Sequence, residues 1–476
     1  MSDVLVAPVQ APPQEQRGHG TRLLVPILAF AGIVTALMQT LIVPVVPELP
    51  RLLNASAADT IWAVTATLLA AAVATPIVGR LGDMYGKRRL LLVSLGLLVV
   101  GSSVAGLSTT LVPLIAGRVL QGLAAGVIPL GISIMRDELP SEKLGSATAV
   151  MSASLGVGGA IGLPVAALLA QTTDWHVLFW TSAVLGAGAF VLVWAKIPSG
   201  AAPAGGRFDL PGAIALSAAL IALLLAISKG ASWGWGAPLT TSLFAGALVL
   251  FLAWGWWELR TPAPLVDLRT TAHRQVLLTN LASIIFGFSM FAMSLVLPQL
   301  LQLPTTTGYG LGQTMLAAGL VMAPMGLVMM AMAPVSARIT DAFGPRTTLM
   351  IGAGVVALSY GLGVFFMAEI WQLVVVSAIM GAGVGLSYGA MPALIMGAVP
   401  RSETAAANSL NTLMRSIGTS VSSAVAGVVL AQLTITAGGA ELPSQTAFQV
   451  VLGIGASAAL VALGIAAFLP RRTKAL

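Results

Sequence analysis

Residues 79–89 read GRLGDMYGKRR, and residues 337–346 read ARITDAFGPR. The two stretches share an arginine, an aspartate, a glycine and a second basic residue, and each residue lies 258 positions from its counterpart, as Asp341 does from Asp83. Chance explains one such pair but not four within a matching apolar frame. The sequence therefore predicts two related halves, each carrying one copy of this loop.

The composition around the two loops is that of a membrane protein. Of 476 residues, 57% are hydrophobic and only 8% charged, which is too little charge to cover a soluble protein of this length. Only helices and closed barrels satisfy the backbone in lipid. Barrel strands read as short alternating segments, whereas this chain repeats apolar runs of about 20 residues, so we predict a helical bundle.

Fourteen apolar runs are long enough to cross a bilayer. They lie near 23–47, 60–80, 90–108, 111–135, 145–170, 176–196, 210–228, 239–257, 275–302, 313–336, 347–367, 371–397, 404–432 and 447–469. We therefore expect a cytoplasmic tail at 1–22, a six-helix bundle at 23–196, a linker with two extra spanning helices at 197–274, a second six-helix bundle at 275–469 and a cytoplasmic tail at 470–476.

The basic residues predict the orientation of these spans. With the N-terminus in the cytoplasm and the runs threaded alternately, only Arg51 and Lys229 of the 23 lysines and arginines fall outside, and Arg118 and Arg415 fall within helices. The other nineteen are cytoplasmic. We expect a multi-pass protein of a bacterial-type cytoplasmic (inner) membrane with both termini inside, and the net charge of +7 then reflects topology and not nucleic-acid binding.

Three motifs resemble those of one transporter family. The loop at 79–89 resembles the loop signature of the major facilitator superfamily, LIAGRVLQG at 114–122 resembles its fourth-helix motif, and GVGGAIGLP at 156–164 resembles the glycine-rich motif of its antiporters. Two extra helices between the halves, beginning with FDLPG at 208–212, are similar to those of the fourteen-helix drug:proton antiporter family. The resemblance implies an all-α integral membrane protein of the major facilitator fold, with two six-helix bundles plus two extra central helices.

The repeated loop is suited to a cytoplasmic gate. Glycine permits a tight turn between adjacent helices, and the aspartate can pair with nearby arginines or cap a helix N-terminus. Such a clasp would form in one conformation and break in the other, while the alternative is a plain basic loop. The residues that we predict to act in proton coupling or gating are Arg118, Gln121, Asp83, Arg80, Gly86, Arg88, Asp341, Arg338, Asp137 and Glu138.

Arg118 is the best single candidate for function. It is expected near the middle of a spanning helix, where a charge costs several kcal/mol and needs a polar partner, and Gln121 lies one turn away. The resemblance implies a role for Arg118 in proton transfer or conformational coupling. A structural arginine bonded to backbone carbonyls is the alternative.

None of the 16 acidic residues is expected in the middle of the membrane. Position 39 holds glutamine, where the family that the chain resembles commonly has an acid in its first helix. Proton coupling would then use acids near the cytoplasmic helix ends, or the cargo is not a simple cation. Our hypothesis is a neutral, zwitterionic or anionic cargo.

Polar and aromatic side chains within the predicted helices are candidates for the wall of a central cavity, although ordinary packing and hydrogen bonding between helices is the alternative. The predicted substrate-binding residues are Gln39, Trp62, Asn280, Phe286, Met290, Asn411 and Arg415. The predicted helix-packing residues are Gly156, Gly158, Gly159, Gly162 and Pro164. The glycines would let the fifth helix approach a neighbour closely, and the proline would kink or loosen that helix.

No phosphate-binding loop, zinc-ligand spacing or nucleophile arrangement occurs in the sequence, and there are no cysteines, so we expect no enzyme activity, no metal and no cofactor. We predict a secondary transporter that uses the proton gradient for efflux of drug-like or lipophilic small molecules by alternating access. Its expected partners are its substrate, protons and membrane lipids, with no nucleic acid, and we expect a monomer. The alternatives are a metabolite or lipid carrier without proton coupling, and a receptor or scaffold that transports nothing.

Overall fold

The computed structural model describes residues 20–42, 45–46, 48–199, 205–437 and 440–470. Within these ranges, fourteen helical segments are long and apolar enough to cross a membrane, as the sequence predicts. They are α1 (Gly20–Thr40), α4 (Trp62–Tyr85), α5 (Lys87–Gly106), α6 with α7 (Leu111–Gly122 and Val127–Glu138), α8 (Ser141–Thr172), α9 (His176–Lys196), α10 (Leu210–Trp233), α11 (Pro238–Glu258), α13 (Arg274–Gln302), α14 with α15 (Met315–Ala331 and Ala333–Phe343), α16 (Pro345–Phe365), α17 (Ile370–Met396), α18 (Thr404–Gln432) and α19 (Gln445–Ala467).

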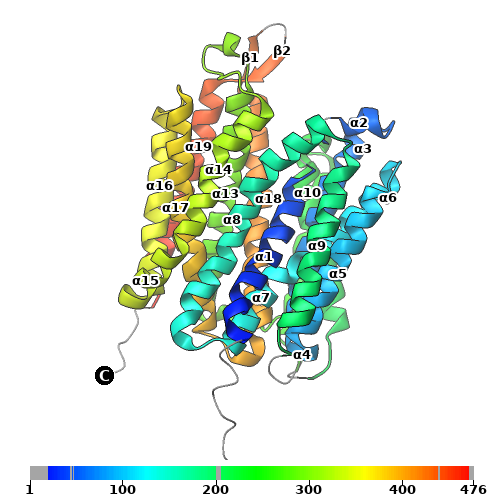
Figure 1. Ribbon diagram of the computed structural model, residues 1–476, viewed down its shortest axis with the longest axis vertical. Helices are drawn as coiled ribbons and strands as arrows, with labels where there is room; N and C mark the ends of the chain where they lie inside the picture. The colour runs from blue at the N-terminus through cyan, green and yellow to red at the C-terminus, as the bar shows by residue number, and fades with distance from the viewer. Residues whose placement is uncertain (1–19, 43–44, 47, 200–204, 438–439, 471–476) are drawn as a thin grey trace, which may run out of the picture.

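Short elements connect the spanning helices. They are α2 (Leu49–Leu52), α3 (Ala57–Thr60), η3 (Leu123–Gly126), α12 (Leu268–Ala272), η4 (Thr305–Thr307), η5 (Arg401–Glu403) and the antiparallel strands β1 (Thr434–Ala437) and β2 (Ala440–Pro443). The sequence reading did not predict the β-hairpin. In Figure 1 it stands at the end of the molecule opposite the start of α1. The Tyr309 hydroxyl, whose pKa is raised by burial, donates to the carbonyl of Pro443 and so joins the hairpin to the loop before α14.

Several predicted spans differ at their ends from the helices that form, among them the first two. The run predicted to reach residue 47 is helical to Thr40, and residues 43, 44 and 47 of that run lie outside the described residues. The run predicted to end at residue 80 continues as α4 to Tyr85. Its last turn carries Asp83, so the charges that close the apolar run are still part of the helix.

The chain folds into two helical bundles that meet along two seams (Figure 1). The first half comprises α1–α9 and the second half α13–α19. One seam is made by α8 packing along α14 and α17, and the other by α4 packing along α18. Each bundle has its own apolar core, although Ala149 and Ala153 of α8 join the core of the second half.

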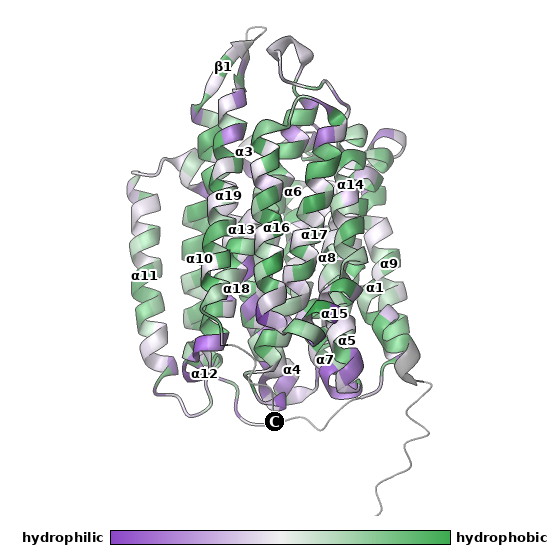
Figure 2. Ribbon diagram, turned by 90° about the vertical axis from the view of Figure 1, so that its left-hand side faces the viewer, coloured by the Kyte–Doolittle hydropathy of each residue, from purple (hydrophilic) through white to green (hydrophobic). Residues whose placement is uncertain are grey.

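The two extra helices form an antiparallel pair on the flank of the bundle. The inner helix α10 packs on both α4 and α18, so it covers the seam between the halves, and α11 packs on α10. Leu216 and Leu220 of α10 share an apolar cluster with Leu410 and Leu413 of α18. Figure 2 shows α11 at the edge of the molecule. The pair is therefore central in the sequence but peripheral in space.

Candidate gating site and buried arginines

Each copy of the repeated loop turns at its glycine, as predicted. Gly86 lies between α4 and α5 with φ +111°, and Gly344 lies between α15 and α16 with φ +85°. Both angles fall in the region that side chains rarely adopt, so only glycine joins the two helices here without strain.

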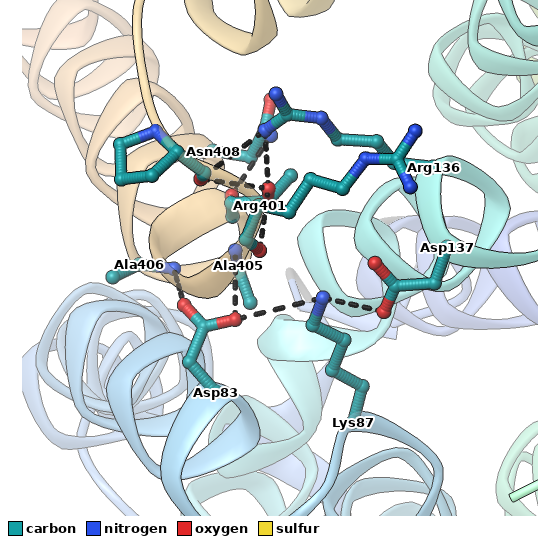
Figure 3. A network of polar contacts seen from close by, with 10 residues as sticks. Asp83, Lys87, Arg136, Asp137, Arg401, Ala405, Ala406 and Asn408 are labelled. Atoms are coloured by element: carbon teal, nitrogen blue, oxygen red, sulfur yellow. Dashed lines mark hydrogen bonds and ion pairs between the residues drawn. The ribbon is translucent and has the colours of Figure 1, made fainter. Parts of the chain in front are cut away.

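Asp83 of the first half caps a helix of the second half. Its side chain is 4% exposed, and its carboxylate accepts hydrogen bonds from the backbone N–H groups of Ala405 at 3.3 Å and Ala406 at 2.9 Å. These groups lie in the first turn of α18, where backbone N–H groups have no partner within the helix and the helix dipole favours a negative charge. Of the two predicted roles for this aspartate, helix capping is the one that forms (Figure 3).

Lys87 lies between the carboxylates of Asp83 and Asp137. Its Nζ atom lies 2.6 Å from Asp137 Oδ2 and 3.8 Å from Asp83 Oδ1, so it ties α5 to the end of α7 while it faces the capping carboxylate. Asp137 is therefore paired within the first half. Glu138, the other acid predicted here, is the last residue of α7. Arg80 makes no ion pair with Asp83 among the residues described and instead lines a cavity with Glu403.

Arg136, which is not among the residues predicted to act in gating, bonds the other half of the molecule. From the end of α7 it donates to the carbonyls of Met396 at 2.7 Å, Val399 at 3.0 Å and Pro400 at 3.3 Å. These oxygens lie at and after the end of α17, where carbonyls lack partners within the helix and a positive charge is favoured. The sequence held one indication of this role, since Arg136 directly precedes the acids Asp137 and Glu138. A basic residue that only sets the orientation of a span needs no acids beside it. We call Asp83, Lys87, Arg136 and Asp137 the clasp.

The second copy of the loop forms no such clasp. Asp341 and Arg338 are exposed, and within the described chain no hydrogen bond or ion pair reaches Asp341. Its Oδ1 atom would lie 3.9 Å from a Cβ on Gly145, in the second turn of α8. Asp341 is thus near the start of a first-half helix without bonding to it.

The second basic residue of each loop copy makes the same contact. Arg88 donates from Nη2 to the carbonyl of Trp194 at 2.5 Å, and Arg346 donates from Nη2 to the carbonyl of Ala467 at 2.6 Å. Both acceptors lie at the end of the last helix of their own half. The repeat thus preserves this internal brace in both halves.

Arg118 is fixed in the interior of the first half. It is 2% exposed, and it donates to the carbonyls of Ala63 at 2.9 Å and Met38 at 3.2 Å and to Gln121 Oε1 at 2.8 Å. Gln121 donates in turn to Ser102 Oγ at 2.8 Å. Gln121, the expected partner, is therefore present. The backbone carbonyls that a purely structural arginine would bond are present as well. A role in coupling stays a prediction.

The predicted substrate residues of the second half lie in two groups. Asn411 of α18 donates to Asn280 Oδ1 of α13 at 3.0 Å, which is a contact between helices of one bundle. Arg415 is half-buried and lies over the ring of Tyr388, with 4.6 Å between Cζ and the ring centroid. The Tyr388 hydroxyl lies 3.6 Å from the sulfur of Met290. These three residues place a cation, an aromatic ring and a thioether together on α18, α17 and α13.

The remaining substrate candidates are less well supported. Phe286 is 1% exposed within the core of the second half, so its contacts are those of ordinary packing. Trp62 packs against Lys229 of α10, whose Nζ lies 4.8 Å from the ring centroid, so this ring faces the extra helices. Gln39 is half-buried near the end of α1. Substrate binding by these residues stays a prediction.

The glycine-rich helix α8 runs unbroken through Pro164. A Cβ on Gly326 of α14 would collide with the carbonyl of Gly156, and one on Gly319 would lie 3.1 Å from the Pro164 nitrogen. Gly156 and Pro164 therefore face the other half. Gly158 and Gly162 face α1 in their own half.

Gly159 does not fit the packing prediction. A Cβ added there would meet nothing within 4 Å. No neighbouring helix therefore comes close to α8 at this residue. Helical periodicity explains the error, because consecutive residues on a helix point in directions about 100° apart.

The acids of the spanning segments lie where the sequence predicts. Each is within two residues of an end of its span: Asp83, Asp137, Glu138, Glu142, Glu258, Asp341 and Glu403. In the part of the chain that the structure describes, the charges in the middle of spans are therefore the arginines at 118 and 415.

The sequence matches the family model of the Major Facilitator Superfamily over residues 28–358 and again over 279–476. The chain belongs to the Major Facilitator Superfamily. It is accordingly a membrane protein with many candidate spanning helices.

Curated relatives of this superfamily member include named drug exporters. It is 27% identical over 418 residues to a tetracenomycin C resistance and export protein of Streptomyces glaucescens, covering 85% of this chain and 75% of that protein. It is 27% identical over 444 residues to a multidrug resistance protein B homolog of Mycobacterium tuberculosis, covering 90% and 80%. The chain spans only 58% of the length of the first curated relatives that it matches.

A solved structure has the same fold. The crystal structure of the human organic anion transporter MFSD10 aligns with a TM-score of 0.64 at 15% identity, covering 95% of this chain and all of that one. At this identity the likeness concerns the fold alone.

Proposed function

We propose that this transporter exports drug-like or lipophilic small molecules across the cytoplasmic membrane by proton-coupled alternating access. The names of relatives that export tetracenomycin C or confer multidrug resistance support the class of cargo and the direction. The observation that carries the transport cycle is the clasp, in which residues of the first half bond helix ends of the second half at one end of the molecule.

The clasp is built to open. Its contacts across the seam join charged side chains to backbone groups at helix ends and to the Thr404 hydroxyl, which accepts from Arg136. A rigid-body rotation of one half would separate these contacts together. Hydrogen bonds to charged groups contribute about 1.5–3 kcal/mol each. Water would satisfy the same groups once the seam opened, so the closed state is stabilised without being locked.

The charge distribution supports a cargo that is not a simple cation. The spans described here carry Arg118 and Arg415 in their middle parts, and their acids lie at the ends. Burying a cation beside unpaired arginines would be unfavourable, because like charges in a low dielectric repel strongly. We propose a neutral, zwitterionic or anionic cargo.

The distribution of lysine and arginine supports an orientation with both termini and the clasp in the cytoplasm. Residues 1–19 and 471–476 lie outside the described chain. In this orientation the conformation described is closed toward the cytoplasm.

Transport into proteoliposomes under an imposed pH gradient tests the proposal. The panel would contain neutral, zwitterionic, anionic and cationic drug-like compounds, with Asp83→Asn as the gating variant and the exposed Glu142→Gln as its control. We expect gradient-dependent accumulation of non-cationic compounds, reduced about tenfold or more by Asp83→Asn. Movement that ignores the gradient would instead identify an uncoupled carrier, and transport of cations alone would overturn the cargo proposal.

A further inference from the structure

The extra helices contain a buried acidic pair that the sequence reading did not single out. Asp209 is the residue before α10 and Glu258 is the last residue of α11, so the antiparallel arrangement brings them to the same end of the pair. They are 7% and 3% exposed. Burial of two acids at one place needs a physical reason, because acidic residues are almost never fully buried without a partner.

The two carboxylates meet over Gly212. A Cβ at this position would collide with Asp209 Oδ2 and would lie 3.0 Å from Glu258 Oε1. The Trp254 indole donates to Glu258 Oε1 at 2.8 Å, and the Trp257 indole donates to Asp209 Oδ1 at 3.1 Å. The two carboxylates thus occupy the space that a side chain at Gly212 would fill. The indole N–H groups of two tryptophans bond them in this position.

One oxygen of the pair has no partner. Glu258 Oε2 is buried and makes no hydrogen bond. Among the described residues no lysine, arginine or histidine lies within 4.0 Å of either carboxylate. The nearby arginines bind elsewhere, since Arg260 stacks on Trp256 and Arg269 donates to the carbonyl of Leu259.

A single proton would remove both costs. Two neighbouring carboxylates without a cation do not readily ionise together, and an unpartnered buried oxygen pays its desolvation in full. A proton on Glu258 Oε2 would turn this atom into a donor and leave one negative charge for the two indole N–H groups and the backbone N–H of Gly212, which donates to Asp209 Oδ1. We propose that Asp209 and Glu258 form a proton-binding site in the extra helices.

The proposed site also adjoins the clasp. The backbone of Leu265 and Val266 lies beside the Glu258 carboxylate. The same two residues line a cavity of about 190 Å³ that is also lined by Ala406, a donor to Asp83.

The charged groups that face this cavity are Arg80, Asp267 and Glu403. Gain or loss of the proton would thus act next to residues that line the same cavity as the capped turn of α18. This inference rests on the proposed proton coupling, for which it supplies a site.

Infrared difference spectroscopy of the purified chain in lipid nanodiscs tests proton binding directly. We expect a carboxylic-acid carbonyl band that disappears as the pH is raised, is absent in Glu258→Gln, and disappears at lower pH in Asp209→Asn because the neighbouring charge is gone. Glu142→Gln, an exposed acid at a helix end, is the matched control and should leave the band unchanged. A band that survives in Glu258→Gln, with the variant folded by thermal melting, would overturn the inference.

Gradient-driven transport separates this inference from the proposed function. If both hold, Glu258→Gln lowers accumulation at least about tenfold, while Glu142→Gln does not. If the unmodified chain ignores the gradient but shows the titrating band, proton coupling fails and the site stands. Full gradient response in Glu258→Gln would contradict the link between this site and the clasp.

Discussion

The two copies of the repeated loop share a sequence but not a set of contacts. In the first copy, Asp83 is buried and bonds two backbone N–H groups of α18 across the seam. In the second copy, Asp341 is exposed close to the second turn of α8 and bonds nothing in the part of the chain described. The braces made by Arg88 and Arg346 are nevertheless alike.

The difference separates two functions of one motif. The glycine and the second basic residue shape each half, and these interactions are present in both copies. The aspartate acts between halves, so its contacts depend on how the halves are placed. In this conformation polar contacts of the clasp join the halves beside α4 and α18. At the same end α8 packs on α15, and among the described residues no hydrogen bond or ion pair reaches Asp341 of α15.

Removal of Arg136 should have the largest effect. Arg136→Ala removes the donor to three carbonyls of the second half, a loss of about 3 kcal/mol that corresponds to a roughly hundredfold change in the ratio of closed to open clasp. Cysteine accessibility at the clasp end would measure it, since the chain has no native cysteine. Arg338→Ala, an exposed arginine of the second loop, is the matched control, and equal accessibility in both variants would contradict the account.

The paired substitutions Asp83→Asn and Asp341→Asn break the comparison itself. Asparagine keeps the shape of aspartate but loses the charge that the start of α18 favours, at a cost of about 1–2 kcal/mol. We expect initial transport rates to fall about tenfold for Asp83→Asn and to stay within about twofold for Asp341→Asn. A larger loss at position 341 would show that the second copy carries the gate in another conformation.

The brace residues should behave alike. Arg88→Ala and Arg346→Ala each remove one hydrogen bond to the last helix of a half, so we expect each to lower the free energy of unfolding by about 1–2 kcal/mol. Thermal unfolding in nanodiscs would measure both. If the two losses in unfolding free energy differed by more than about 2 kcal/mol, the two braces would not be equivalent, and the account would be wrong for contacts within each half.

The smallest effect is expected in the loop between α8 and α9. A backbone hydrogen bond from His176, followed by the bond to its ring, holds the pKa of Asp174 below its ordinary value. Because the pKa is lower in the folded chain, this contribution to stability is present above the unfolded pKa of about 4 and is lost only as the pH falls through the folded value.

Asp174→Asn should therefore leave the pH dependence of transport between about pH 5 and pH 8 unchanged. Any response in that range then arises from other groups. A shifted transport profile in Asp174→Asn, measured beside the unmodified chain, would count against this assignment.

Local patterns made much of the fold predictable. Fourteen spans follow from apolar runs, the positive φ of Gly86 and Gly344 follows from the repeated loop, and the bond between Arg118 and Gln121 follows from their spacing along one helix. Each depends on residues close together in the sequence.

Contacts between distant segments could not be predicted in the same way. No residue near Asp83 in the sequence indicates that its carboxylate accepts from backbone N–H groups more than 300 residues away. The sequence around Arg136 likewise does not show that its guanidinium donates to carbonyls of the other half. The meeting of Asp209 with Glu258 depends on how α10 and α11 pair. That a Cβ on Gly159 would meet no neighbouring helix depends on how α8 is rotated about its axis.

The most direct test of the clasp is a distance measurement across it. Spin labels at Tyr85→Cys and Ser402→Cys, both exposed positions at the clasp end, would be compared with and without Asp83→Asn and Arg136→Ala together in lipid nanodiscs. We predict a short distance in the parent and a population shifted to longer distances in the double variant. An unchanged distance distribution in a folded double variant would contradict the claim that these residues hold the two halves together.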